Sequence, residues 1–342
     1  MARLHLGILG TGNIARQFAD AVTESRRCRL AAVGSRSEGA AEGFAEEFSI
    51  ARAHSSYEAL LADDAVEAVY VSLPNSLHHE WTLRALRAGK HVLCEKPLAT
   101  SVAEVEEMFD VAQQCGRVLV EAFLYRSHPL THAVMQRVRD GAIGQLKLIR
   151  TSFCFRTRQV ASNIRFDPEL AGGALMDVGC YCISLSRLLA GGEPDQVSVA
   201  AHVHETGVDE RAVGTMHFPG GVLACFSCGM TVQTNNTAYI CGEEGYIEVP
   251  VPWKPPMHKA RYVVAAMTPP RQDGGGTAPP RQVFEVDAAR PAFALEADDF
   301  AAAVLDGAEP AVSRDDSLGN MRVLETMRQQ VAGAEFRVPD AG

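Results

Sequence analysis

Lys96 lies at a position where a charged side chain can take part in chemistry. It belongs to the tripeptide Glu95-Lys96-Pro97, which directly follows the short apolar run Val-Leu-Cys at 92–94. Such a run predicts a buried strand, and the ligands of open α/β sheets bind outside the carboxyl ends of the strands. We therefore expect Lys96 to face a bound cofactor rather than the hydrophobic core.

Two further reactive side chains, Asp177 and Tyr181, are spaced i, i+4 in the segment Gly172-Gly173-Ala-Leu-Met-Asp177-Val-Gly-Cys-Tyr181. On a helix predicted over residues 174–190, this spacing places both side chains on one face. The two glycines would allow the helix to start close to another backbone or to a ligand.

These three residue types suit the oxidation of an alcohol. The reaction removes a hydride from carbon and a proton from oxygen, so a general base must lie within hydrogen-bonding reach of the hydroxyl. A free tyrosine titrates near ~10, and an adjacent ammonium would lower that pKa. We expect Lys96 to supply the charge, Asp177 to orient the lysine, and Tyr181 to transfer the proton in either direction. The alternative, with Lys96 as the acid/base group and Tyr181 as a substrate clamp, stays open.

A glycine turn near the start of the chain indicates which cofactor is bound. The segment Gly10-Thr11-Gly12-Asn13-Ile14-Ala15 follows a strand-like run at 3–9 and opens a stretch with helical spacing. Glycines in this pattern let the backbone approach a pyrophosphate at the N-terminus of a helix. Ser35 and Arg36 end the next predicted strand, where enzymes that prefer NAD usually carry an acidic residue, so NADP is favoured over NAD.

The elements that position these residues divide the chain into two parts. Between residues 3 and 121, short strand-like runs alternate with helical segments, which predicts a parallel sheet with helices on both faces. From residue 123 onward the strand candidates are longer, at 145–156, 196–204, 211–218, 222–230 and 237–249, with Pro219-Gly220-Gly221 and 242–245 as hairpin connections. This pattern predicts an α+β domain with a mostly antiparallel open sheet.

We therefore predict a doubly wound Rossmann domain at 1–123 and a substrate-binding and oligomerisation domain at 124–342. Helices at about 293–306 and 315–332 can pack back on the first domain. The segment 265–282, rich in proline and glycine, indicates a connection to which we assign no site.

Composition restricts the partners of this 342-residue chain. Its formal net charge is −10, which makes nucleic acid and anionic membranes poor partners and favours a small molecule. Nine scattered cysteines fit buried thiols in a reducing compartment, so we expect a cytoplasmic protein. Cys180 and Cys182, Cys225 and Cys228, and the run His78-His79-Glu80 lack the spacing of a metal site, and we predict none.

Taken together, the glycine turn, Glu95-Lys96-Pro97 and the segment 172–181 resemble the Gfo/Idh/MocA family of oxidoreductases. Within that family, the segment 121–129 and Tyr181 look most like dimeric dihydrodiol dehydrogenases and NADP-dependent xylose dehydrogenases. The resemblance implies a Rossmann domain, catalytic roles for Lys96 and Tyr181, and an open sheet often used for dimerisation. A homodimer or tetramer through the C-terminal sheet is therefore expected.

The same resemblance supplies contact residues. For the cofactor, these are Gly10, Thr11, Gly12, Asn13, Ile14, Ser35, Arg36, Leu73, Asn75, His78, Glu95 and Lys96. For a hydroxylated substrate, the candidates are Tyr125, Arg126, His128, Arg158, Asn163 and Arg165.

The predicted function is NADP-dependent transfer of a hydride between nicotinamide and a sugar, polyol or vicinal diol. One alternative with the same fold is an enzyme that retains its cofactor, similar to glucose-fructose oxidoreductases or nicotinamide-dependent glycosidases. Another is a non-enzymatic regulator that senses the dinucleotide, against which the presence of Lys96, Asp177 and Tyr181 together argues.

Overall fold

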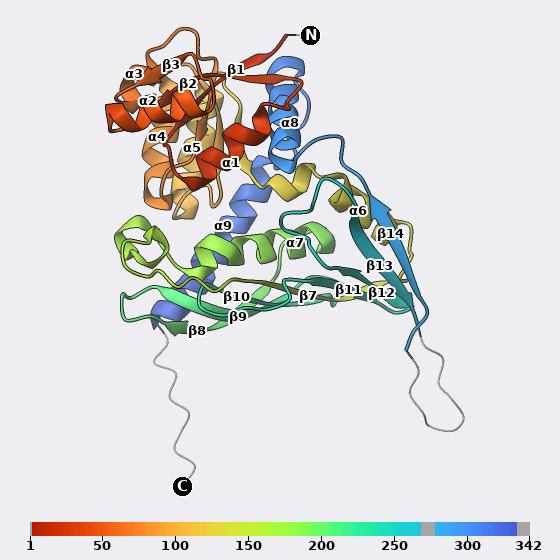
Figure 1. Cartoon of the computed structure of the whole chain (residues 1–342). Coiled ribbons are helices and arrows are strands. Elements are labelled where there is room, and N and C mark those ends of the chain that lie inside the picture. Colours follow the sequence, from red (N-terminus) through yellow and green to blue (C-terminus); the bar gives the residue numbers. More distant parts are fainter. Residues whose placement is uncertain (1, 268–277, 334–342) are drawn as a thin grey trace, which may run out of the picture.

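The first half of the chain forms a six-stranded parallel sheet with helices on both faces (Figure 1). The structure is a computed structural model that describes residues 2–267 and 278–333. The strands follow the order β3-β2-β1-β4-β5-β6. They are β1 (Leu4–Leu9), β2 (Cys28–Gly34), β3 (Arg52–His54), β4 (Ala68–Val71), β5 (His91–Glu95) and β6 (Leu119–Ala122). The helices are α1 (Asn13–Val22), α2 (Glu38–Glu47), α3 (Tyr57–Leu61), α4 (Asn75–Arg87) and α5 (Val102–Gln114).

The second half forms an eight-stranded sheet in the order β14-β13-β12-β11-β7-β10-β9-β8. Its strands are β7 (Leu146–Cys154), β8 (Gln196–Val203), β9 (Asp209–His217), β10 (Leu223–Gly229), β11 (Ala238–Gly242), β12 (Gly245–Val249), β13 (Ala260–Ala266) and β14 (Arg281–Val286). Only β7 and β10 pair in parallel, and every other described pair in this sheet is antiparallel. Both parts of the predicted fold class, a parallel Rossmann sheet and a mostly antiparallel open sheet, are confirmed.

The remaining helical segments connect and cover the sheets. They are η1 (Leu124–Ser127), α6 (Pro129–Arg139), η2 (Ile164–Phe166), η3 (Pro168–Leu170), η4 (Leu175–Gly179), α7 (Cys180–Ala190), α8 (Ala292–Asp306) and α9 (Arg314–Gly333). Of these, η4 is a turn of π-helix rather than α-helix. The helix expected over 174–190 therefore begins as a π-helical turn and continues as α7.

The strands β13 and β14 were not among the strands expected from the sequence. They pair with each other from Ala260 to Val286 and extend the sheet beyond β12. Part of the proline- and glycine-rich connection expected at 265–282 falls at 268–277, outside the described residues. The two hairpins expected at 219–221 and 242–245 join β9 to β10 and β11 to β12.

The last two helices bind the two halves together. In α8, the carboxylate of Asp298 accepts hydrogen bonds from Ser25 Oγ at 2.5 Å and from the Arg27 backbone N–H at 2.9 Å. In α9, Arg328 donates to the carbonyl of Thr100 at 2.9 Å, while another part of the same helix packs on α7 and β8. The polypeptide therefore returns to the Rossmann sheet after completing the second sheet.

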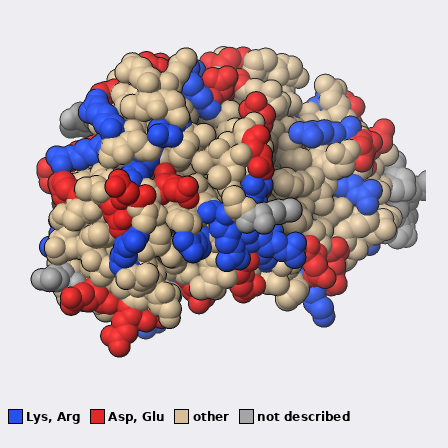
Figure 2. Space-filling model, turned by 90° about the horizontal axis from the view of Figure 1, so that it is seen from above, with Lys and Arg blue, Asp and Glu red and all other residues tan. Residues whose placement is uncertain are grey.

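One face of the eight-stranded sheet carries α7, and its opposite face is left uncovered (Figure 1). The apolar stretch Pro168–Ala190, which includes α7, is long enough to cross a bilayer, but 83% of its most apolar window is buried inside the protein. The stretch is therefore packed in the interior of the protein. On the face shown in Figure 2, acidic and basic side chains are interspersed.

Candidate active site

Lys96, Asp177 and Tyr181 lie together between the two sheets. Lys96 follows the carboxyl end of β5, and its ammonium donates to the backbone carbonyl of Asp177 at 2.8 Å and to Asp177 Oδ1 at 3.3 Å. The same ammonium lies 5.2 Å from the centroid of the Tyr181 ring. Arg165 donates from Nε to the other carboxylate oxygen, Asp177 Oδ2, at 2.6 Å. Asp177 is therefore shared by two cations.

The charges of this group stabilise each other. Burial alone would raise the pKa of Asp177, but Lys96 and Arg165 together lower it below its ordinary value. Burial would likewise lower the pKa of Lys96, but the charge of Asp177 overcomes this effect and raises it. The pair is thus an ammonium and a carboxylate throughout the neutral pH range.

The structure overturns one expectation about Tyr181. Burial, together with the nearby charge of Glu95, raises the pKa of Tyr181 well above its ordinary value, whereas we expected Lys96 to lower it. The physical reason is that the Lys96 ammonium lies over the ring face and is directed at Asp177. In this arrangement Tyr181 holds its proton at neutral pH.

Aromatic rings surround Tyr181. Phe123 and Phe153 meet it edge to face, with centroids at 5.2 and 5.3 Å, and Trp253 meets it at 6.0 Å. Trp253 also stacks on Phe153, with centroids 5.5 Å apart and an interplanar angle of 5°. Sequence reasoning missed Phe153 and Trp253. The position of Trp253 inside Val-Pro-Trp-Lys-Pro-Pro, at 251–256, was the available signal.

Two glycines explain how the helix carrying Asp177 approaches its neighbours. A Cβ at Gly172 would lie 2.4 Å from the carbonyl oxygen of Arg165, and one at Gly173 would lie 2.2 Å from Asp209 Oδ1. Asp209 Oδ2 in turn accepts a hydrogen bond from the backbone N–H of Leu175 at 2.7 Å. The helix therefore starts against another backbone, as expected, and is capped by a carboxylate from β9.

The glycine turn fits a dinucleotide. Gly10 has φ +102°, and a Cβ there would meet Leu73 and the carbonyl of Ser72 at 3.1 and 3.3 Å. A Cβ at Gly12 would meet nothing within 4 Å, so the space beside the N-terminus of α1 is open. No side chain caps this terminus, and its first turn carries no acidic residue. Thr11, Asn13 and Ile14 form the same turn, whose free N–H groups suit a bound phosphate.

Ser35 and Arg36 extend the same edge of the sheet. Ser35 is buried just beyond β2, and Arg36 is exposed. Burial raises the pKa of Tyr57, and the neighbouring Arg36 guanidinium opposes that rise. The exposed Arg36 guanidinium therefore lies near Tyr57, just beyond the end of β2.

His78 and Glu95, both predicted to contact the cofactor, are buried next to the loops that follow β4 and β5. His78 is fully buried, with Nδ1 at 2.8 Å from the carbonyl of Pro97 and Nε2 at 2.8 Å from that of Leu73. Its ring therefore links the loop after β4 to the loop after β5 through these two contacts. Glu95 is also buried and accepts a hydrogen bond from the hydroxyl of Tyr70 in the core. These hydrogen bonds give both side chains a supporting role, and their contact with the cofactor stays a prediction.

Leu73 and Asn75 lie at the carboxyl end of β4. Leu73 is buried against Gly10. Asn75 begins α4 and donates from Nδ2 to the carbonyl of Ala171 at 2.9 Å, so its amide links the Rossmann domain to the segment before η4. Both residues border the cleft.

The candidate substrate residues fall into two groups. Arg165 reaches Asp177, and Arg158 and Asn163 lie in the same segment before η4, where Asn163 Oδ1 accepts from the Arg165 backbone N–H at 3.2 Å. By contrast, Tyr125 and His128 are fully buried, the first bonded to Ser184 and the second capping α6. Arg126 pairs with Asp316 of α9 at 3.2 Å.

Tyr125, Arg126 and His128 thus have packing and pairing roles, and their contact with substrate stays a prediction. The reason is that η1 turns these side chains toward α7, α9 and the start of α6. Among the residues that the structure describes, no group of three or more His, Cys, Asp or Glu side chains could hold a metal ion.

Comparison with known proteins identifies the family. Residues 4–123 match the family described as "Oxidoreductase family, NAD-binding Rossmann fold", and residues 131–248 match the GFO/IDH/MocA C-terminal domain. The chain is 36% identical to a D-xylose 1-dehydrogenase (NADP(+)) of Haloferax volcanii, over 94% of this chain and 95% of the relative. It is also 36% identical to the mouse trans-1,2-dihydrobenzene-1,2-diol dehydrogenase, over 74% of this chain and 76% of that relative.

Solved structures agree. A 3-ketoreductase from Actinomadura kijaniata, in complex with NADP and TDP-benzene, superposes with a TM-score of 0.87 at 31% identity, covering 96% of this chain and 98% of the other. An aldose-aldose oxidoreductase from Caulobacter crescentus, complexed with glycerol, gives a TM-score of 0.84 at 30% identity, with the same coverage. These similarities extend over the glycine turn, the Lys96 loop and both sheets. The chain therefore belongs to the Gfo/Idh/MocA family of oxidoreductases.

Proposed function

We propose that this protein is an NADP-dependent oxidoreductase that transfers a hydride between nicotinamide and a carbinol carbon of a sugar, polyol or vicinal diol. The observation that carries the proposal is the Lys96 ammonium, held by Asp177 at 3.3 Å and lying 5.2 Å from the Tyr181 ring centroid, at the carboxyl end of β5. A bound dinucleotide would supply the hydride donor or acceptor. The residues of the chain would supply and remove the proton.

NADP rather than NAD is supported by two independent observations. Ser35 and Arg36 end β2 without an acidic side chain for the ribose hydroxyls. The relative from Haloferax volcanii carries NADP(+) in its name, and the ketoreductase was solved with NADP. A planar guanidinium is suited to a phosphate because it can donate two parallel hydrogen bonds.

The proton-transfer roles are supported by the charges in the cleft. When a carbonyl is reduced, the growing negative charge on oxygen must be met by a donor. Tyr181, whose pKa is raised, and Lys96, fixed as an ammonium, can both donate. Variants of the Actinomadura ketoreductase were solved with a lysine replaced by alanine or glutamate and with a tyrosine replaced by phenylalanine. In that protein the tyrosine follows the lysine at nearly the separation of Tyr181 from Lys96.

The aromatic and polar walls of the cleft describe the substrate. Phe153 and Trp253 offer flat apolar surfaces beside Tyr181, while the guanidinium of Arg165, bonded through Nε to Asp177, offers further hydrogen-bond donors. Ring faces pack on the C–H surface of a sugar or cyclic diol, and donors bind its hydroxyls. A ring that carries neighbouring hydroxyls therefore fits this cleft.

A second candidate is an enzyme that oxidises one aldose and reduces another without releasing its cofactor. The similarity to an aldose-aldose oxidoreductase favours it. Purified protein would then carry bound nucleotide, and mixed aldoses would react without added NADP.

The deciding experiment is a panel of aldoses, polyols and cyclic vicinal diols, each with NADP or NAD, followed by the absorbance of the reduced cofactor. We expect turnover with at least one member and a preference for NADP. Clear dinucleotide binding without turnover on any member, alone or mixed, would reject the proposal.

Lys96→Met tests the proton-transfer role. We expect turnover to fall by at least about a thousandfold, because both the ammonium and the alignment of Asp177 are lost, while NADP affinity stays within about tenfold. Lys147→Met, which removes an exposed lysine of β7, is the matched control and should keep full activity. Substantial turnover by Lys96→Met would reject the role.

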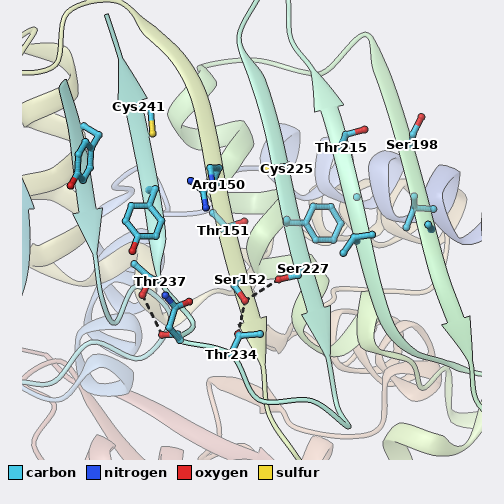
Figure 3. A pocket seen from close by; sticks show the side chains of 18 residues that line it. Arg150, Thr151, Ser152, Ser198, Thr215, Cys225, Ser227, Thr234, Thr237 and Cys241 are labelled. Carbon is cyan, nitrogen blue, oxygen red and sulfur yellow. Dashed lines mark hydrogen bonds between the residues drawn. The ribbon is translucent and has the colours of Figure 1, made fainter. Parts of the chain in front are cut away.

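We further propose a cytoplasmic homodimer. Scattered unpaired cysteines support a reducing compartment, since all nine are free thiols. The uncovered face of the eight-stranded sheet supports self-association. It carries a shallow groove of about 980 Å³ lined by Arg150, Thr215, Cys225 and Cys241 among others (Figure 3).

A further inference from the structure

A lysine from the second domain reaches across the cleft to the first. Lys254 donates from Nζ to the side-chain oxygen of Gln17 at 3.4 Å. Gln17 lies in the second turn of α1, directly behind the open N-terminus formed by the glycine turn. The contact therefore joins the loop after β12 to the helix whose N-terminus suits a phosphate.

The loop holds Lys254 firmly. The preceding residue, Trp253, is buried, donates from Nε1 to the carbonyl of Ser152 at 2.8 Å and stacks on Phe153. Pro252 and Pro255, which flank the pair, are buried as well. A side chain that starts from such an anchor loses little further freedom when it binds a ligand.

The charge of Lys254 lacks a carboxylate partner among the residues that the structure describes. Lys254 is itself exposed to solvent, but partial desolvation of its ammonium lowers its pKa; Lys96 and Arg165 add to this effect, while Glu95 and Asp177 oppose it. Asp177 is already shared by Lys96 and Arg165, and Glu95 is bonded to Tyr70 in the core. Within residues 2–267 and 278–333, Lys254 Nζ hydrogen-bonds to the neutral amide of Gln17, at the long distance of 3.4 Å.

We propose that Lys254 binds the diphosphate of the dinucleotide and so closes the second domain over the cofactor. With an anion at the N-terminus of α1, Lys254 would give up its weak hydrogen bond to the Gln17 amide and make a charge-assisted one to the anion. The anion would also offset the excess of positive charge in the cleft. The inference rests on the proposed use of NADP. It is independent of the proton-transfer roles of Lys96 and Tyr181.

The test is direct binding, measured by calorimetry or by cofactor fluorescence, without turnover. Lys254→Met should weaken NADP and 2′-phospho-ADP-ribose alike, by about tenfold or more, because both contain the diphosphate. It should leave 2′-AMP, which lacks the diphosphate, within about twofold. Lys254→Arg keeps the cation and should stay within about threefold for all three ligands.

The controls separate this inference from the wider proposal. Lys147→Met should bind every ligand as the wild type does, and equal thermal midpoints without ligand would show that Lys254→Met is folded. Unchanged NADP affinity in Lys254→Met, or an equal loss for 2′-AMP, would overturn the inference. Failure of the wild-type protein to bind NADP would instead overturn the proposed function.

Discussion

At the scale of single residues, the chemistry depends on the arrangement of one carboxylate and two cations. Asp177 accepts from Lys96 and Arg165 through different oxygens, which fixes both cations and keeps the carboxylate charged. Burial and the nearby charge of Glu95 raise the pKa of Tyr181, so its hydroxyl keeps its proton. A site of this kind favours donation over acceptance at neutral pH. Reduction should therefore be the easier direction, and oxidation should need a higher pH.

This argument predicts the pH dependence. The raised pKa of Tyr181 keeps the phenol protonated throughout the range from pH 7 to pH 9, so oxidation should accelerate over that range, by up to about tenfold per pH unit. Carbonyl reduction should stay nearly constant over the same range. Steady-state kcat/KM profiles in both directions measure this difference.

Tyr181→Phe distinguishes the two assignments of the proton. If Tyr181 transfers it, the variant should lose the steep pH dependence of oxidation together with most of its rate. A variant that is slow but has the same pH profile would show that Lys96 is the acid/base group and that Tyr181 positions the substrate.

Arg36 carries a separate prediction about the cofactor. Arg36→Ala should weaken NADP by about tenfold or more and leave NAD within about twofold, because only NADP has a 2′-phosphate. Arg29→Ala, an exposed arginine at the opposite end of β2, is the control and should change neither. Equal losses for NADP and NAD would show that Arg36 does not contact the 2′-phosphate.

At the scale of elements, local patterns predicted most of the site but few of its side-chain directions. The alternation of apolar runs and helical spacing predicts the Rossmann strands, and it places Lys96 after β5, where the structure has it. The same patterns cannot show that η1 turns Tyr125 and His128 inward, because that depends on the packing of α6, α7 and α9. They also cannot show the π-helical turn at η4, whose start is set by Asp209 from a distant strand.

Another supporting element is the loop that follows Lys96. Glu121, at the end of β6, accepts a hydrogen bond from the Leu98 backbone N–H at 2.9 Å. Burial raises the pKa of Glu121 to about 7, an effect that Ser317 of α9 and Leu98 oppose. The carboxyl group thus anchors the loop through Leu98, although burial destabilises its ionised form.

The sign of the resulting stability change follows from linkage. A folded-state pKa above the unfolded value means that Glu121 stabilises the fold at low pH and that this contribution is lost as the pH rises through about 7. Glu121→Gln keeps the acceptor for Leu98 and cannot ionise. Relative to wild type, its free energy of unfolding should gain about 3 kcal/mol between pH 4 and pH 8.

Urea denaturation at pH 4 and pH 8 measures that gain. Glu24→Gln, at an exposed glutamate, is the matched control and should follow the wild type at both pH values. An equal difference between Glu121→Gln and wild type at both pH values would show that Glu121 does not ionise differently on folding.

At the scale of the whole molecule, the two halves play different parts. Helices α8 and α9 connect the Rossmann domain to the second domain and fix one side of the interface between them. Lys254 makes a further hydrogen bond across this interface, to Gln17. The eight-stranded sheet turns one face toward the cleft and leaves the other uncovered (Figures 1 and 3). On this outer face, Val213 and Leu223 are 57% and 41% exposed, beside Cys225 and Arg150. An exposed apolar surface of this kind marks an interaction site.

The proposed homodimer leads to a prediction that separates assembly from folding. Arg150 lies on the uncovered face of the central strand β7. In a two-fold dimer formed by this face, the residues around Arg150 would contact the same residues of a second copy. Arg150→Glu places an acid near the middle of such an interface and should shift the protein to a monomer, measured by analytical ultracentrifugation. Lys147→Glu makes the same charge change on the same strand with its side chain on the opposite face, and should leave the dimer intact. A wild-type protein that sediments as a monomer would reject the dimer, whereas a monomeric Arg150→Glu with a wild-type Kd for NADP would show that cofactor binding is complete within one chain.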